Sequence, residues 1–281
     1  MFRELLPYLQ CPTCSHTSLE LQVVREDAGE VLEGSLVCRR CSRVTLIEDG
    51  ILDAIGETPV PWTPAQLTNY RPPAAWGYER LWRWQALRLL SGQPFPLRDE
   101  LRLVRALLAP ERGGLVLDVA CSTGLYARVC AATAPHAVVA AVDHSAAMLR
   151  ETQRRARRAG LRISCVRAAA QALPFRAGVT TAYGMGGSLN EIGDIDAMLA
   201  EAHRILRNDG RFVSMHLLAA ESSWGRALQR VLSTGGIVFP QASRLRERFA
   251  AAGLRRVAEW RWRVVAVNLL LPSARTIQPP L

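Results

Sequence analysis

Short apolar runs alternate with amphipathic stretches over most of the chain. The runs have the length of buried strands, and the stretches repeat apolar side chains at the spacing of a helix. Strands that alternate with helices predict a parallel, doubly wound sheet with helices on both faces. The strands are expected at residues 115–119, 137–142, 163–166, 179–185 and 212–218, and the helices at 97–109, 124–133, 146–159 and 243–252.

Two more apolar runs lie near the end of the chain, at residues 257–260 and 263–271. They predict an antiparallel pair of strands at one edge of the sheet and bring the expected total to seven strands. Ligands of such sheets bind at the carboxyl ends of the parallel strands, so the turns after these strands are the places to look for chemistry. Trp224, Trp260 and Trp262 are expected to pack rather than to act on a ligand.

Two pairs of cysteines distinguish the first sixty residues. Cys11 and Cys14 form one C-x-x-C pair, Cys38 and Cys41 form another, and 23 residues separate the pairs. Each pair can form a tight turn that directs two thiolates at one ion, and four thiolates complete a tetrahedral zinc site. We therefore expect residues 1–58 to be a small zinc ribbon whose metal is structural. A redox-active pair is the alternative.

Residues 59–98 are rich in proline and tryptophan. Five prolines between 59 and 73 predict a linker, and a helical cap is expected to follow over 78–90. The aromatic residues either seal the ribbon against the main domain, residues 99–281, or form a lid over an apolar substrate. The four tryptophans of this segment are Trp62, Trp76, Trp82 and Trp84.

Charge is distributed unevenly between these parts. The 281 residues carry a net charge of +10, and all 35 basic residues are arginine. Residues 1–58 hold 5 arginines and 10 acidic residues, whereas the rest of the chain has a net charge of +15. Seven arginines between 150 and 167 are typical of a solvated helix face, with phosphate binding as the alternative. The charge is compatible with an anionic partner such as RNA and does not require one.

No apolar run reaches the roughly 18 to 20 residues needed to cross a bilayer. The N-terminus also lacks the layout of a signal peptide. The sequence therefore predicts a cytoplasmic protein, in which paired cysteines indicate metal binding rather than disulfides.

A turn of small residues, Asp118 to Gly124, follows the first strand of the main domain. Small side chains there let a ligand approach the backbone N–H groups at the start of the next helix. The second strand ends at Asp143, whose carboxylate suits the two hydroxyls of a ribose. Together these features predict a nucleoside site. The turn holds one glycine, so the dinucleotide fingerprint G-x-G-x-x-G is absent and a dehydrogenase is disfavoured.

Four motifs in order resemble those of class I S-adenosylmethionine-dependent methyltransferases. They are LDVACSTG at 117–124, AVDHSAAML at 141–149, QALPF at 171–175 and RILRNDGRF at 204–212. The resemblance covers residues 99–271. With the cysteine-rich N-terminus, the chain is similar to plastoglobule-type methyltransferases of plants and their bacterial relatives and, more distantly, to quinone methyltransferases. This resemblance implies a Rossmann-like α/β fold with a mostly parallel seven-stranded sheet.

The resemblance also implies S-adenosyl-L-methionine as the cofactor, in addition to Zn2+ at the cysteines. Ala120 and Ser122 stand where the family has glycines, and Ala169 stands where it has an acid that holds the adenine. These departures leave open a protein that binds S-adenosylmethionine without transferring its methyl group. The cofactor contacts that the resemblance implies are Asp118, Ala120, Ser122, Gly124, Asp143, His144, Met148, Ala169, Ala170 and Gly184.

The expected function is methyl transfer to a small-molecule acceptor, and the aromatic linker favours an apolar one. An rRNA or tRNA methyltransferase and a SAM-binding protein without catalytic activity are the alternatives. Asn190 is a candidate for orienting the acceptor, and Glu191 and His216 lie near the expected site as well. A capping or surface role is favoured for all three, so no catalytic residue is assigned.

Overall fold

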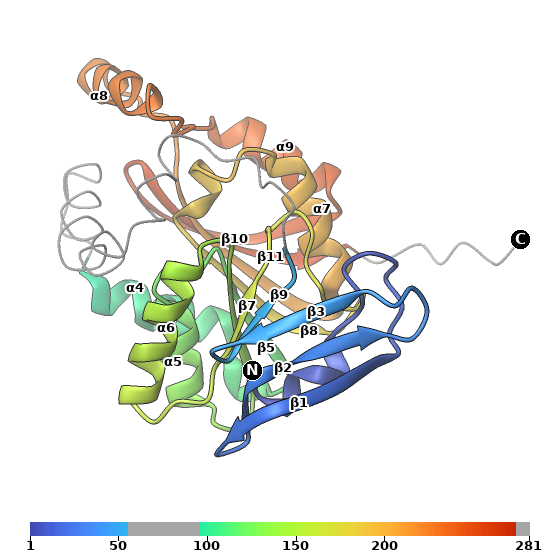
Figure 1. Cartoon of the computed structure of the whole chain (residues 1–281). Helices are drawn as coiled ribbons and strands as arrows, with labels where there is room; N and C mark the ends of the chain where they lie inside the picture. The colour runs from blue at the N-terminus through green and yellow to red at the C-terminus, as the bar shows by residue number, and fades with distance from the viewer. Residues whose placement is uncertain (56–95, 274–281) are drawn as a thin grey trace, which may run out of the picture.

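The computed structural model describes residues 1–55 and 96–273, which contain one mixed β-sheet (Figure 1). Its strands are β1 (Leu19–Asp27), β2 (Glu30–Cys38), β3 (Val44–Glu48), β4 (Ile51–Asp53), β5 (Leu115–Val119), β6 (Val138–Asp143), β7 (Ser164–Arg167), β8 (Thr180–Gly186), β9 (Leu206–Leu217), β10 (Leu254–Trp262) and β11 (Val265–Pro272). Their order across the sheet is β1-β2-β3-β4-β7-β6-β5-β8-β9-β11-β10. Strands β4 to β9 in that order run parallel, and the strands at both ends are antiparallel.

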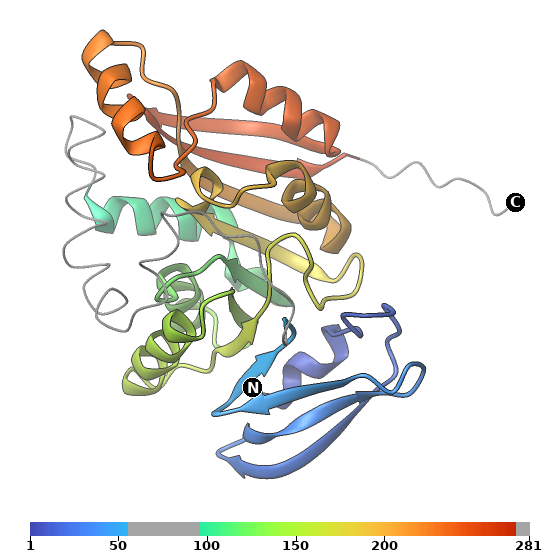
Figure 2. The same ribbon diagram turned by 45° about the horizontal axis from the view of Figure 1, so that its top comes forward.

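Helices cover both faces of this sheet. Helices α4, α5 and α6 pack on one face, and η1, α7 and α9 lie on the other (Figures 1 and 2). In the described part of the chain, no helix has both the length and the apolar character needed to span a membrane. The helices are η1 (Arg3–Tyr8), α4 (Leu97–Leu108), η4 (Pro110–Arg112), α5 (Leu125–Thr133), α6 (Ala146–Arg158), η5 (Ser188–Asn190), α7 (Ile195–Ile205), α8 (Ser223–Ser233) and α9 (Ala242–Ala251).

The alternation of side chains along the strands produces two apolar cores. In β5, Leu117 faces the core beneath α7 and α9, whereas Val116 faces the core beneath α4 and α5. Each of the five residues of β5 is buried, as expected for a central strand with helices on both faces. The predicted parallel core with an antiparallel pair at one edge is therefore confirmed. The expected total of seven strands is wrong, because the sheet has eleven strands, four of them from the N-terminal region.

Strand β9 begins earlier than predicted, at Leu206 rather than at residue 212. A register shift between Thr180 and Ala182 of β8 lets Leu206 pair with Thr180 while Arg211 pairs with Ala182. The polar residues between Leu206 and Arg211 form a β-bulge at this register shift. Because these residues are polar, the hydrophobic pattern does not identify the start of the strand.

The N-terminal region does not stand apart as a ribbon in front of the sheet. Strand β4 pairs in parallel with β7, so the four N-terminal strands extend the same sheet. Ile51 and Leu52 of β4 are buried by this pairing. The pairing also covers the edge of β7, which would otherwise expose unpaired backbone groups. The separate boundary near residue 58 stays a prediction, since residues 56–95 lie outside the described part.

Arginines of the main domain meet acids of the N-terminal region. Five of the seven arginines between 150 and 167 are ion-paired, and three of these pairs join the two regions. The charge asymmetry in the sequence is therefore partly an internal complementarity rather than a surface for an outside anion. The three joining pairs are Arg157–Glu30, Arg162–Glu4 and Arg167–Asp53.

The proline-rich linker with Trp62, Trp76, Trp82 and Trp84 and the helix expected over 78–90 lie outside the described residues. The amphipathic helix expected at 97–109 is α4, and its apolar face packs inward through Val104, Leu107 and Leu108.

Candidate functional site

The turn after β5 is held in a left-handed backbone conformation. Ala120 and Ser122 both have a φ of 52°, and Gly124 has a φ of 71°. Side chains with a Cβ pay roughly 1–2 kcal/mol for this conformation, which is the reason glycine is usual there. The fold keeps the conformation because neighbours bond the turn: the Ser188 hydroxyl donates to the carbonyl of Ala120, 3.0 Å away, and the Thr152 hydroxyl donates to that of Ser122, also 3.0 Å away.

At Gly124, unlike at Ala120 and Ser122, the structure leaves no room for a side chain. A Cβ at this position would lie 2.3 Å from Cγ2 of Thr152, which is too close for any side chain. Asp118 fixes the next helix, because its Oδ2 accepts a hydrogen bond of 2.9 Å from the backbone N–H of Ala127 in α5. The turn is thus clamped between β5, α5 and α6.

Asp143 connects this turn with the start of α6. Its Oδ2 accepts from the backbone N–H of Ser122 at 2.8 Å, and its Oδ1 accepts from that of Ser145 at 2.9 Å. Burial raises the pKa of Asp143, although the imidazole of His144 and the two N–H donors oppose the shift. Each carboxylate oxygen has a second lone pair, so the group can still accept hydroxyls of a ligand.

The two acids of the candidate nucleoside site, Asp118 and Asp143, lie toward the carboxyl ends of two neighbouring strands. Strands β5 and β6 are parallel neighbours, and Asp118 is opposite Ala141, two residues before Asp143. On the other side of β5, Asp118 is opposite Gly184 of β8. A Cβ on Gly184 would lie 3.3 to 3.4 Å from Leu108 and Tyr126, so the strand approaches α4 and α5 closely here.

The remaining predicted contacts surround Asp143. The Nδ1 atom of His144 lies 3.5 Å from its Oδ1, and Met148 is buried beneath the turn, where its sulfur accepts from the Ser122 hydroxyl at 3.5 Å. Ala169 and Ala170 follow β7 in a short loop in which the N–H of Ala172 donates to the carbonyl of Ala169 at 3.0 Å. The ten residues therefore lie near the carboxyl ends of four neighbouring parallel strands.

The residues present fit the ribose end of S-adenosylmethionine better than its adenine end. A buried acid stands at the end of β6, and the turn after β5 consists of residues of small volume. At the position expected to contact adenine, the methyl side chain of Ala169 cannot accept a hydrogen bond from an amino group. The polar groups that the loop from Ala169 to Ala172 offers there are those of its backbone.

Asn190 supports the fold rather than a ligand. It is 2% exposed, and its Nδ2 donates to the carbonyls of Leu217 at 2.7 Å and Val238 at 2.6 Å. Its Oδ1 accepts from the N–H of Leu217 at 2.8 Å. With both donors used inside the protein, the amide has none left to orient an acceptor.

His216 is also structural. The ring is fully buried, contacts Phe249 edge-on, and bonds Ser214 through Nδ1 at 3.1 Å and Asn268 through Nε2 at 3.4 Å. Burial lowers the pKa of His216 to about 3, so the ring is neutral and is not a base for a ligand. Asn190 and His216 are both buried, so the capping or surface role expected for them is wrong, and each instead bonds groups inside the fold.

Glu191 differs from these two residues. It follows η5 at the carboxyl side of β8, and its carboxylate makes no hydrogen bond or ion pair within the described ranges. Burial, reinforced by the charge of Asp143, raises the pKa of Glu191 to about 7. A carboxyl group in this state can take up a proton near neutral pH.

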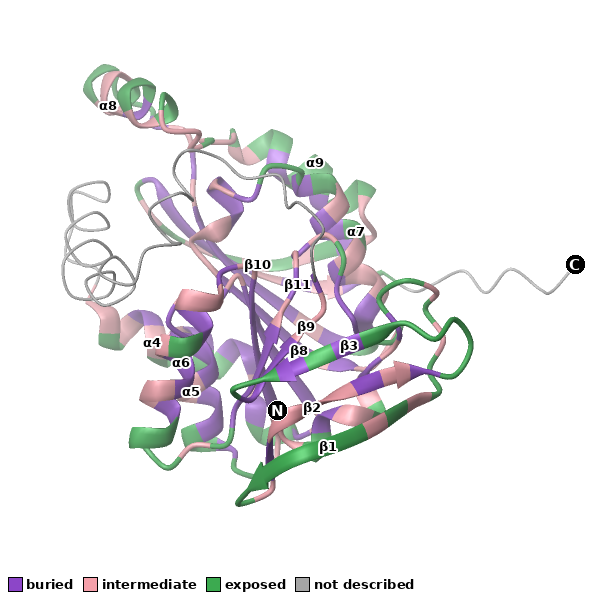
Figure 3. Ribbon diagram, in the orientation of Figure 1, coloured by how far each residue is buried: buried purple, intermediate pink, exposed green. Residues whose placement is uncertain are grey.

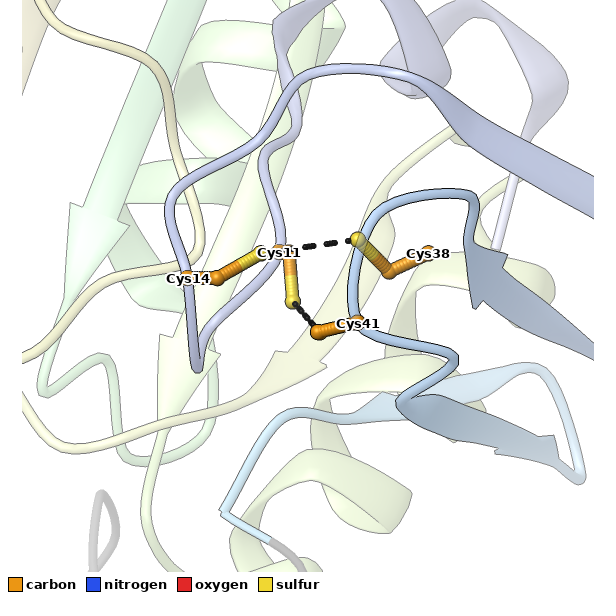
Figure 4. Close-up of side chains that lie close together, drawn as sticks. All are labelled: Cys11, Cys14, Cys38 and Cys41. Atoms are coloured by element: carbon orange, nitrogen blue, oxygen red, sulfur yellow. Dashed lines mark hydrogen bonds between the residues drawn. The ribbon is translucent and has the colours of Figure 1, made fainter.

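The four cysteines of the N-terminal region converge at one point (Figure 4). The Sγ atoms of Cys11 and Cys41 are 3.5 Å apart, those of Cys14 and Cys38 are 3.6 Å apart, and all four lie within 4.8 Å of one another. Tetrahedral zinc with sulfur at about 2.3 Å places its ligands about 3.8 Å apart. The donor set and spacing therefore fit Zn2+, with no ligand position left for a substrate.

Both cysteine pairs use the same backbone turn. Ser15 and Ser42 each have a φ of 58° and donate their N–H groups to the carbonyls of Cys11 and Cys38, both at 2.9 Å. These repeated turns direct two thiols from each pair toward the centre. His16 takes no part: its Nδ1 accepts from the N–H of Ser18 at 3.2 Å.

The cysteine cluster is attached to the loop after β7. The N–H of Gln10 donates to the carbonyl of Pro174 at 3.0 Å, and the N–H of Arg176 donates to that of Tyr8 at 2.9 Å. Pro174 belongs to the motif that follows Ala169 and Ala170. Sequence reasoning missed this contact, because residues 1–10 show no pattern that points to a partner more than 160 positions away.

The sequence comparisons agree with the geometry. Residues 116–210 match the family model described as a methyltransferase domain, which includes the turn, Asp143 and the loop after β7. Residues 116–210 are therefore a methyltransferase domain, and the resemblance of the four motifs to class I S-adenosylmethionine-dependent methyltransferases is confirmed.

Two curated relatives and one solved structure illustrate the relationship. An uncharacterized chloroplastic methyltransferase of Arabidopsis thaliana is 28% identical over 225 residues, which cover 74% of this chain and 61% of the relative. The ubiquinone/menaquinone biosynthesis C-methyltransferase UbiE of Allorhizobium ampelinum is 37% identical over 38% of this chain and 44% of its own length. The mitomycin 7-O-methyltransferase MmcR shares the fold, with a TM-score of 0.58 at 15% identity over 75% of this chain and 61% of that chain. The chain thus spans less than two thirds of the length of each of these three proteins.

Proposed function

We propose that this protein transfers a methyl group from S-adenosylmethionine to a small apolar acceptor. The observation that carries the proposal is the bond from the Ser122 N–H to Asp143, which joins the turn after β5 to the acid at the end of β6. In this arrangement a carboxylate and small-residue backbone would contact one nucleoside. The names of the bacterial relative and of the solved mitomycin enzyme denote methyl transfer to small molecules, which supports the same class of acceptor.

We assign the acceptor to a hollow at the carboxyl end of the neighbouring strand β9. A hollow of about 590 Å3 opens beyond the carboxyl end of β9, between α8 and the turn that joins β10 to β11. Ala219, Ala220, Leu228 and Val264 supply apolar lining. Its volume is in the range of ordinary small-molecule sites, and its lining favours an apolar body.

Methyl transfer requires mainly that the protein orient the methyl donor and the acceptor. Bound S-adenosylmethionine supplies an activated methyl sulfonium, so the protein has to align donor and acceptor, an effect that lowers barriers by up to roughly 7–11 kcal/mol. Asp143 would hold the ribose, and the turn from Asp118 to Gly124 would seat the rest of the cofactor. Glu191 is the group that would accept a proton from an acceptor that loses one.

Cofactor binding is the first test. Isothermal titration should give saturable binding of S-adenosylmethionine, and Asp143→Asn should weaken it at least about tenfold, because the neutral amide is a poorer acceptor for ribose hydroxyls. Glu33→Gln is the matched control, an acid-to-amide change at an exposed ion pair with Arg25. Absence of binding at millimolar cofactor contradicts the proposal.

Transfer itself is tested with labelled cofactor and a cell extract separated into lipid and RNA fractions. Label in the lipid fraction supports the proposed acceptor class, and label in RNA alone supports the rRNA or tRNA alternative. Binding without any labelled product supports the SAM-binding protein that does not transfer methyl. Glu191→Gln should lower turnover about a hundredfold with little change in cofactor affinity if the acceptor loses a proton.

A further inference from the structure

Helix α8 exposes part of its apolar face to solvent. Trp224 is 78% exposed and Val231 is 66% exposed, and their spacing of seven residues puts them on one face. Gln229, five residues after Trp224, lies about 140° further round the helix and is its buried side chain. Figure 3 shows α8 largely exposed at the margin of the molecule. A helix that covers a core has the opposite arrangement, so the expectation that Trp224 packs is wrong.

The side chain of Gln229 joins α8 to the rest of the protein by two hydrogen bonds. The Oε1 atom of Gln229 accepts from the N–H of Ala220 at 2.8 Å, and its Nε2 donates to the carbonyl of Leu218 at 2.9 Å. The hollow of about 590 Å3 lies on one flank of α8, and a second groove of about 430 Å3, lined by Arg230 and Phe239, lies on another. The helix therefore stands off the body, as Figure 2 also shows.

Positive charge accompanies the exposed apolar face. Residues 222–246 contain four arginines and no acid. Within the described residues, the side chains of Arg230 and Arg263 make no ion pair. Arg230 follows Trp224 by six residues and so lies on the flank of the apolar face, about 120° round the helix. Arg263 lines the same hollow as Trp224.

We propose that α8 docks the protein on the surface of an anionic lipid bilayer. Trp224 and Val231 enter the boundary between headgroups and acyl chains, and Arg230 and Arg263 meet the phosphates. An interfacial helix has this combination of an apolar face with tryptophan and an arginine-rich polar face. A lipid surface fits better than a protein partner, because lipids deform around a protruding helix, whereas a stable protein interface needs about 1,000 Å2 of complementary surface.

The test is co-sedimentation of the full chain with vesicles. Wild type is expected to sediment with phosphatidylcholine vesicles that contain about 30% phosphatidylglycerol, and less with phosphatidylcholine alone. Trp224→Ser and Val231→Ser should each lower the partition coefficient about tenfold, because each removes apolar surface from the bilayer. Arg230→Gln should lower it about fivefold on the anionic vesicles alone.

Val24→Ser is the matched control, since Val24 is 79% exposed on β1 and is expected to leave the partition unchanged. Equal partition of wild type and Val231→Ser overturns the proposal. So does a vesicle-independent doubling of mass in light scattering that Val231→Ser abolishes, because a second copy would then cover α8. The measurement uses no cofactor, so its outcome does not depend on the proposed methyl transfer. An unchanged melting temperature of Val231→Ser shows that the variant is folded.

Discussion

Arg167 and Asp53 form an ion pair of 2.7 Å that joins the last positions of β7 and β4. The same guanidinium donates through Nε to the carbonyl of His144, the residue after Asp143, at 3.1 Å. One side chain therefore links the cysteine-bearing region to the candidate cofactor site. The N-terminal strands extend the sheet and also support the edge at which a nucleoside would bind.

This link predicts that Arg167→Met weakens cofactor binding from a distance. Both partners are about one third exposed, so the pair itself contributes at most about 1 kcal/mol to stability. The loss of support for His144 should raise the dissociation constant for S-adenosylmethionine about two- to fivefold, as measured by titration. Arg25→Met, which breaks the exposed pair with Glu33, should change nothing. Equal affinities for wild type and Arg167→Met would show that the N-terminal region does not support the site.

The left-handed turn predicts a stabilising glycine. Ala120 has no polar side-chain atom, and its φ of 52° is strained for any residue with a Cβ. Ala120→Gly should therefore raise the free energy of unfolding by about 0.5–1 kcal/mol, after the greater flexibility of glycine in the unfolded chain is subtracted. Denaturant titration measures the change. Ala106→Gly, on the exposed side of α4, should have the opposite sign and cost about 1 kcal/mol. A loss of stability in both variants would mean that the turn prefers alanine.

The features that could be predicted from the sequence are those whose residues lie close together along the chain. The two C-x-x-C pairs, the turn after β5 and the acid at the end of β6 each occupy a few neighbouring residues, and the structure brings each group together. The ion pair of Arg167 with Asp53 spans 114 positions, so no local pattern contains it. For the same reason, the sequence does not reveal that three of the arginines between 150 and 167 pair with acids of the N-terminal region.

Helix α8 shows a second kind of limit. An amphipathic pattern identifies a helix but does not state which side faces the protein, and a buried tryptophan is the common case. Here Gln229 is buried, because its amide satisfies backbone groups of Ala220 and Leu218. The exposure of Trp224 depends on this tertiary contact.

His216 predicts a loss of stability in acid. In the unfolded chain its pKa is near 6.5, whereas burial in the fold lowers the pKa to about 3. Between these values the unfolded state binds one more proton, so the free energy of unfolding falls as the pH drops through this window. The slope is at most about 1.4 kcal/mol per pH unit. His216→Gln, which keeps an amide near Ser214 and Asn268, should flatten the stability profile of the protein between pH 6 and pH 4, and an unchanged slope would contradict the buried neutral ring.

The cysteine cluster predicts one zinc ion per chain with a structural role. Cys38→Ser removes a buried ligand atom, and three thiolates hold zinc far more weakly than four. We expect metal analysis to give about one zinc in the wild type and less than a tenth of that in Cys38→Ser. Cys130→Ala is the control, since Cys130 is buried in α5, away from the cluster, and its loss should leave the zinc content unchanged. Because the N–H of Gln10 bonds Pro174, chelation should lower the melting temperature and weaken cofactor binding together. Zinc loss that leaves cofactor affinity untouched would separate the cluster from the loop after β7, and full metal content in Cys38→Ser would exclude the four-cysteine site.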